Sequence, residues 1–94
     1  MCTYIVEKAQ LYGSAKAGGE WAGVGQANVY FDHPFHVQLD HALGIDFMAG
    51  EGPDARRLAA VELSAQSAER LAHAILAALA AGARAHAIEP EPAL

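Results

Sequence analysis

The sequence contains little cysteine and few cations, and each scarcity excludes a class of protein. Cys2 is the one cysteine among 94 residues, so the chain cannot form an internal disulfide. Lys and Arg together number 6 against 11 Asp and Glu, which gives a formal net charge of −5. Because nucleic acids and anionic membranes are bound through a basic face, we expect neither of them as a partner.

The sequence also has no long hydrophobic run. Its longest strongly apolar stretch, residues 71–83, is rich in alanine and shorter than the roughly 20 apolar residues that a spanning helix needs. The first residues do not have the basic segment, apolar run and cleavage site that are typical of a secretory signal. These absences predict a cytoplasmic protein in which Cys2 is a free thiol.

Large apolar side chains are scarce, although the hydrophobic fraction is 53%. Alanine accounts for 22 residues, and each alanine buries little apolar area. A chain this short forms one domain and buries only about 60–65% of the surface that it exposes when unfolded. The small number of large apolar side chains therefore predicts a homodimer, in which a second copy buries apolar surface that one chain leaves exposed.

Four segments have the composition of β-strands. They cover residues 3–12, 21–32, 37–48 and 57–63. β-Branched and aromatic residues favour the first two, and the third alternates apolar and polar residues, with Leu43, Ile45 and Phe47 on one face. Glycine-rich segments, including the turn at residues 50–54, separate them.

One helix follows the strands. Ser64 is a good N-cap residue, and residues 65–81 contain no helix breaker. Apolar residues recur at helical spacing from Ala68 to Leu79, which predicts one apolar stripe. Gly82 fits the left-handed position that commonly ends a helix.

This order of elements predicts an α+β fold, a four-stranded antiparallel meander with one C-terminal helix packed on one face. We expect a single domain over residues 1–82 and a disordered tail over residues 83–94. One helix covers four strands poorly, so we expect dimerisation through the sheet.

The chemically densest segment lies between residues 32 and 46, where three histidines follow the spacing H-x2-H-x4-H among three aspartates. Imidazoles, carboxylates and thiolates bind zinc, iron and copper. The first prediction is therefore a metal-binding protein or metal-dependent enzyme. Its predicted metal ligands are His33, His36, His41 and Cys2, and its predicted catalytic carboxylates are Asp46 and Asp32. Met1 removal would add the α-amine of Cys2 to this set.

The same residues admit two other interpretations. On one continuous strand, His36 and His41 point to opposite faces, so the histidines also fit structural roles. Acid–base chemistry without a metal would suit a small-molecule binder or a cyclase-like dimeric protein, with Glu62 facing Asp46. Its pocket would be lined by Trp21, Tyr30, Phe35 and Phe47. The third interpretation is a non-catalytic interaction module.

Three segments resemble a family of short actinomycete proteins that contain a domain of unknown function. They are MCTYIVEK at residues 1–8, DHPFH at residues 32–36 and HALGIDF at residues 41–47. The resemblance covers about residues 1–80. It implies a cytosolic bacterial protein, and for some members a place among genes of natural-product biosynthesis, but it assigns no catalytic residue.

Overall fold

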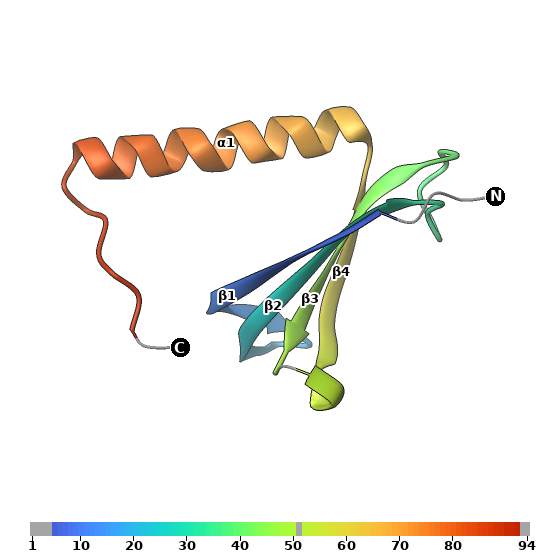
Figure 1. The fold of residues 1–94 in the computed structure, drawn as a ribbon, viewed down its shortest axis with the longest axis horizontal. Coiled ribbons are helices and arrows are strands. Elements are labelled where there is room, and N and C mark those ends of the chain that lie inside the picture. The colour runs from blue at the N-terminus through green and yellow to red at the C-terminus, as the bar shows by residue number, and fades with distance from the viewer. Residues whose placement is uncertain (1–4, 51, 93–94) are drawn as a thin grey trace.

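The computed structural model describes residues 5–50 and 52–92, and these form a sheet followed by one long helix (Figure 1). The strands are β1 (Ile5–Ala17), β2 (Glu20–Asp32), β3 (Ala42–Ala49) and β4 (Arg56–Leu63). They form an antiparallel sheet in the order β1-β2-β3-β4. The short 3-10 helix η1 (Gly52–Asp54) precedes β4, and helix α1 (Ala65–Arg84) follows it. The predicted meander with its C-terminal helix is confirmed.

The strand register separates an apolar face from a polar face, because successive residues of a strand point to opposite sides. The apolar face has three rows of opposed residues, in the order β1 to β4: Ile5, Phe31, Leu43 and Leu63; Glu7, Val29, Ile45 and Val61; Ala9, Ala27, Phe47 and Ala59. The polar face has the rows Val6, Tyr30, Gly44 and Glu62; Lys8, Asn28, Asp46 and Ala60; Gln10, Gln26, Met48 and Arg57. The alternation predicted for β3 from Leu43 to Phe47 is confirmed.

The third strand begins later than its sequence pattern predicts. Residues 33–41 form a loop, and β3 begins at Ala42 rather than at Val37. The backbone N–H groups of Phe35 and Val37 donate to the side chain of Glu62, so they are not available to a neighbouring strand. The predicted strand start was wrong because this side-chain acceptor replaces the sheet ladder.

The helix also ends later than predicted. Gly82 lies inside α1, and the left-handed residue is His86, with φ 57°. The N–H of Ala87 donates to the carbonyl of Gly82 at 2.9 Å, and the N–H of His86 donates to that of Ala83 at 3.0 Å. This pair of bonds is a Schellman motif, which satisfies the last carbonyls of the helix. Residues 87–92 form neither helix nor strand.

Helix α1 leaves the sheet at a fixed angle and gains little cover from it. Ser64 is the one residue between β4 and α1, and its hydroxyl caps the helix by accepting from the N–H of Ser67 at 3.1 Å. The helix contacts β3 and β4 near its start and then diverges from the strands (Figure 1). The radius of gyration is 15.0 Å, against about 12 Å for a compact chain of this length.

The described residues contain no large side chain that is fully buried. Val24, Ala27 and Ala42 are the buried apolar residues among them. No helix in this part of the chain is long and apolar enough to span a membrane. The fold is thus a sheet with two accessible faces rather than a sheet closed over a core.

The left-handed conformation of His86 can be tested by substitution. We expect His86→Gly to raise the free energy of unfolding by about 0.5–1 kcal/mol, because glycine adopts this φ without the steric cost that a Cβ brings. Thermal unfolding followed by circular dichroism measures the change as a rise of a few degrees in Tm. Ala87→Gly, one residue later, is the control and gives no such rise. Equal Tm changes in both variants would contradict the assignment of the helix end.

Candidate functional site

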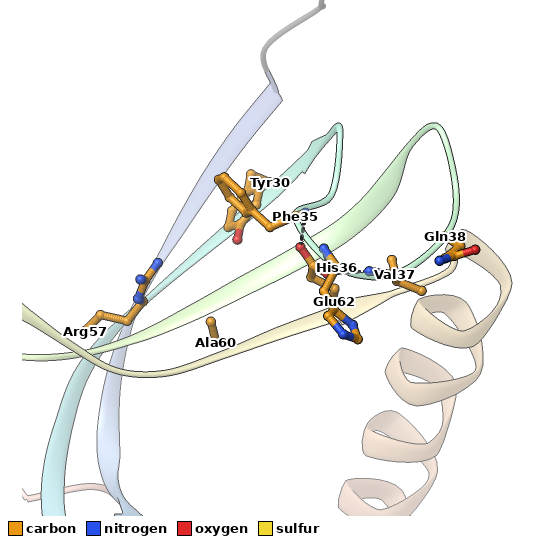
Figure 2. Close-up of a pocket in the computed structure, with 8 residues that line it drawn as sticks. All are labelled: Tyr30, Phe35, His36, Val37, Gln38, Arg57, Ala60 and Glu62. Atoms are coloured by element: carbon orange, nitrogen blue, oxygen red, sulfur yellow. Dashed lines mark hydrogen bonds between the residues drawn. The ribbon is translucent and has the colours of Figure 1, made fainter.

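The polar face of the sheet and the loop of residues 33–41 border an open pocket of about 940 Å³ (Figure 2). It is lined by Tyr30, Phe35, His36, Val37, Gln38, Arg57, Ala60 and Glu62. Strands β2 and β4 supply half of these residues, and the loop supplies the other half. The pocket therefore depends on how the loop is held against the sheet.

Glu62 of β4 holds the loop by accepting three backbone hydrogen bonds. Its Oε2 accepts from the N–H of Phe35 at 2.5 Å, and its Oε1 accepts from those of His36 at 3.0 Å and Val37 at 2.9 Å. The N–H groups of Val37 and Phe35 lower the pKa of Glu62 below its ordinary value of 4.5, because they stabilise the ionised carboxylate. We refer to these three bonds as the Glu62 clamp.

His33 and Asp32 hold the base of the same loop. The ring of His33 donates from Nδ1 to the carbonyl of Asp40 at 2.6 Å, which joins the two ends of the loop. The carboxylate of Asp32 accepts from the N–H of His33 at 2.7 Å. The ring of His41 lies 4.5 Å from the ring of His33 and stacks on Phe31 at 6.0 Å, measured between centroids. These side chains give the loop a defined shape.

The clamped loop presents Phe35 to solvent. Its side chain is 93% exposed, the largest exposure among the large hydrophobic residues that the structure describes. Phe35 lines the pocket together with Tyr30, and Figure 2 shows both on the same side of it. A phenyl ring on a fixed backbone, with water on both faces, leaves a large apolar area for a ligand to cover.

Tyr30, Asp46 and Arg57 form a polar group beside the two rings. The hydroxyl of Tyr30 donates to Asp46 Oδ1 at 3.3 Å, and Arg57 Nη1 lies 3.8 Å from the same oxygen. Burial, followed by the negative charge of Asp46, raises the pKa of Tyr30 above 10.0, so the phenol keeps its proton at neutral pH. The side chain of Arg57 is 60% exposed, which leaves donors available to a ligand.

Gly44 allows the ring of Tyr30 to cross β3. A Cβ atom at Gly44 would overlap the Cε2 and Cζ atoms of Tyr30 and would come within 2.6 Å of its hydroxyl. The two residues are direct partners in the register of β2 and β3. The absence of a side chain at Gly44 therefore lets the phenol reach Asp46.

A second pocket, of about 430 Å³, continues along the polar face. It shares Tyr30, Phe35 and Arg57 with the first, and its other lining residues are Val6, Lys8, Asn28, Asp32, His33 and Asp46. Because three residues belong to both, the two pockets form one groove, which we call the polar groove.

The structure brings some of the predicted metal ligands together and separates others. The rings of His33 and His41 are neighbours, whereas His36 lines the pocket. Cys2 lies outside the described residues. Within residues 5–50 and 52–92, no group of three or more His, Cys, Asp or Glu side chains is placed to share a metal ion. The site on His33, His36, His41 and Cys2 stays a prediction.

The four aromatic residues predicted to line one pocket lie in three different places. Tyr30 and Phe35 line the polar groove. Trp21 lines another hollow, near the turn between β1 and β2, with Arg56 and with Arg57, which it shares with the groove. Phe47 belongs to the apolar face and lines another hollow with Leu11.

The predicted carboxylates take different positions along the groove. Asp46 lies in it beside Tyr30, and Asp32 lies at its loop end. Glu62 does not oppose Asp46, because the register of β3 and β4 places Ala60 there. The sequence pattern did not reveal the Glu62 clamp or the role of Arg57, because both depend on the register and on the path of the loop.

Comparisons with known proteins identify a family and no closer relative. A family model described as "Family of unknown function (DUF6295)" matches residues 1–89. No curated protein and no solved structure matches the chain.

The Glu62 clamp can be tested by neutralising the carboxylate. Glu62→Gln replaces an acceptor of three N–H groups with a neutral amide, so we expect faster hydrogen exchange at Phe35, His36 and Val37, measured by NMR. Glu69→Gln, at an exposed position of α1, is the matched control. Unchanged exchange in Glu62→Gln would contradict the clamp.

The clamp should also respond to pH. Because the pKa of Glu62 is lower in the folded chain, its contribution to stability is complete above the unfolded value of about 4.5. We expect protection of these three amides to persist at pH 5 and to disappear as the pH falls through the lower, folded-state pKa. Loss of protection above pH 5 would contradict this assignment.

The position of Tyr30 can be tested at Gly44. Gly44→Ala places a methyl group where the Tyr30 ring lies, so we expect the bond to Asp46 to break and the pKa of Tyr30 to fall toward 10.0. Ultraviolet titration of the tyrosines measures this shift. Gly23→Ala is the control, because a Cβ there meets nothing within 4 Å. A high-pKa tyrosine that survives in Gly44→Ala would refute the arrangement.

Proposed function

The chain belongs to the DUF6295 family, a family of unknown function, and we propose from its own residues that it binds a small planar organic acid in the polar groove. This is the metal-free small-molecule interpretation of the sequence. The observation that carries it is Phe35, which is 93% exposed and lines the same pocket as Tyr30 and Arg57, with its backbone N–H bound by the Glu62 clamp.

The apolar part of such a ligand would contact Phe35 and Tyr30. A phenyl ring that stays in water gains nothing from burial. A ligand that covers the ring removes apolar area from water, which lowers the free energy by about 25 cal/mol per Å². Aromatic pairs add an attraction of their own when they stack offset or edge to face. A flat ring system therefore suits this end of the groove better than a bulky or fully polar molecule.

The acidic part of the ligand would contact Arg57. A guanidinium binds carboxylate oxygens in pairs, and the single 3.8 Å approach to Asp46 uses only part of its donor capacity. Lys8 lines the same groove and adds a second positive charge. Three carboxylates border the groove and would repel an anion, and each already has partners. Glu62 accepts three N–H groups from the loop, Asp32 accepts the N–H of His33, and Asp46 accepts from Tyr30 beside Arg57.

The size and acid–base groups of the groove fit the same class of ligand. A volume of about 940 Å³ lies at the upper end of the 300–1,000 Å³ that is typical of small-molecule sites. Asp46 and His36 both line the groove, beside the bound ligand. They are the groups that a cyclase-like reaction on an aromatic acid would use, which agrees with the sequence-based expectation of a cytoplasmic bacterial protein in natural-product metabolism.

The proposal can be tested with 2-naphthoate as the probe, by isothermal titration calorimetry. We expect measurable binding, weakened roughly tenfold in Arg57→Gln because a charge-assisted bond is lost. Arg56→Gln is the matched control, because the neighbouring Arg56 lies outside the groove. The neutral analogue 2-naphthalenemethanol should bind wild type about as weakly as 2-naphthoate binds Arg57→Gln.

A second pair of variants tests the aromatic contact. Phe35→Ala should weaken binding of 2-naphthoate, whereas Trp21→Ala, at another exposed aromatic, should leave it unchanged. Equal binding of the acid and the alcohol, or equal losses in Arg56→Gln and Arg57→Gln, would refute the proposal.

A further inference from the structure

Helix α1 carries an apolar stripe that its own sheet does not cover. Leu71, Ile75, Leu76 and Leu79 form this stripe, and their side chains are 45% to 63% exposed. Every residue from Glu69 to Ala81 is exposed, so no side of the helix is packed over this length. An amphipathic helix ordinarily buries such a stripe, because packing of the apolar face supplies most of its stability.

The apolar face of the sheet is incompletely covered as well. Ile5 is 46% exposed and Val61 is 36% exposed, at opposite edges of the face. Between them, Phe31, Ile45 and the other large side chains of the three rows are only half-buried. Within these rows Glu7 is the one charged residue. The face is thus a broad apolar surface.

The exposed area can be compared with that of a folded monomer. The accessible surface is 7213 Å², whereas a compact monomer of 9.9 kDa exposes about 5,200 Å². Part of the excess of about 2,000 Å² per chain belongs to residues 85–92, which are exposed and follow the helix. The excess of two chains is therefore at most about 4,000 Å², against the 2,000–5,000 Å² that obligate homodimers bury. A second copy of this chain is therefore enough to remove the excess.

We propose that two copies form a homodimer in which the α1 stripe of each chain covers the apolar sheet face of the other. The helix diverges from its own sheet directly after the single linking residue Ser64, so its stripe does not lie on that sheet (Figure 1). If only the two helices paired, both apolar sheet faces would stay exposed to solvent. If only the two sheets paired, both α1 stripes would stay exposed. Reciprocal helix-on-sheet packing covers all four surfaces through one two-fold interface.

This dimer leaves the polar groove open, because the groove lies on the opposite face of the sheet. The pocket is lined by polar-face residues and the loop, with no residue of α1. Dimerisation and binding of an organic acid are therefore independent properties, and either can fail without the other.

The mass of the protein in solution tests the dimer directly. Sedimentation equilibrium should give twice the chain mass of 9.9 kDa. Ile75→Glu on the stripe and Val61→Glu on the apolar face should each shift the mass toward the monomer, because each places a charge in the interface. Ala77→Glu is the matched control, since it adds the same charge to an exposed position on the other side of α1 and should leave the dimer intact.

A further measurement covers the case in which the variants unfold. The Tm of the wild-type chain should rise with protein concentration, because a dimer that is more stable than its monomer unfolds by mass action. A wild-type mass of 9.9 kDa with a concentration-independent Tm would overturn the dimer. A dimer that is lost in Ile75→Glu but persists in folded Val61→Glu would overturn the reciprocal pairing. Binding of 2-naphthoate to the wild type, measured in parallel, reports on the groove alone.

Discussion

The acceptance of three loop N–H groups by the Glu62 carboxylate is the interaction on which the candidate site depends. The loop of residues 33–41 has no strand beside it to satisfy its backbone, and a single carboxylate on β4 supplies the acceptors for Phe35, His36 and Val37. Because a carboxylate accepts several hydrogen bonds at once, one side chain sets the path of three consecutive residues. The exposed position of Phe35 over the polar face follows directly from that path.

The alternation of side chains along the strands gives the two faces of the sheet different roles. Residues of even number in the paired part of β2 and β3, including Tyr30 and Asp46, lie on the polar face, and the odd-numbered ones lie on the apolar face. The polar face carries the groove with its charged and aromatic groups. The apolar face and the α1 stripe carry the surfaces that a second chain would cover. The proposed ligand binding and the proposed association would therefore use opposite sides of one sheet.

Much of the fold could be predicted from the sequence because it rests on local signals. The β-branched runs, the alternation from Leu43 to Phe47, and Ser64 as the helix cap act over a few residues, and all appear in the structure. Two boundaries were predicted wrongly, the start of β3 and the end of α1. Val37 continues the alternating pattern of β3 yet lies in the loop, because its N–H donates a hydrogen bond to Glu62, 25 residues away, instead of to a neighbouring strand. The helix passes Gly82 and ends at Arg84, because its many alanines favour the helix and the left-handed residue is His86 instead.

The sequence by itself determined the order and type of the elements, the two-faced character of the sheet and the shortage of large core side chains. Each of these follows from the period and composition of short segments. The tertiary structure alone decided which chemically active residues meet. Asp46 faces Tyr30 and Arg57 because of the register between strands, and Phe35 reaches the groove because of the Glu62 clamp. Such pairings join residues that are 11 to 27 positions apart, so they depend on how the chain returns on itself rather than on local pattern.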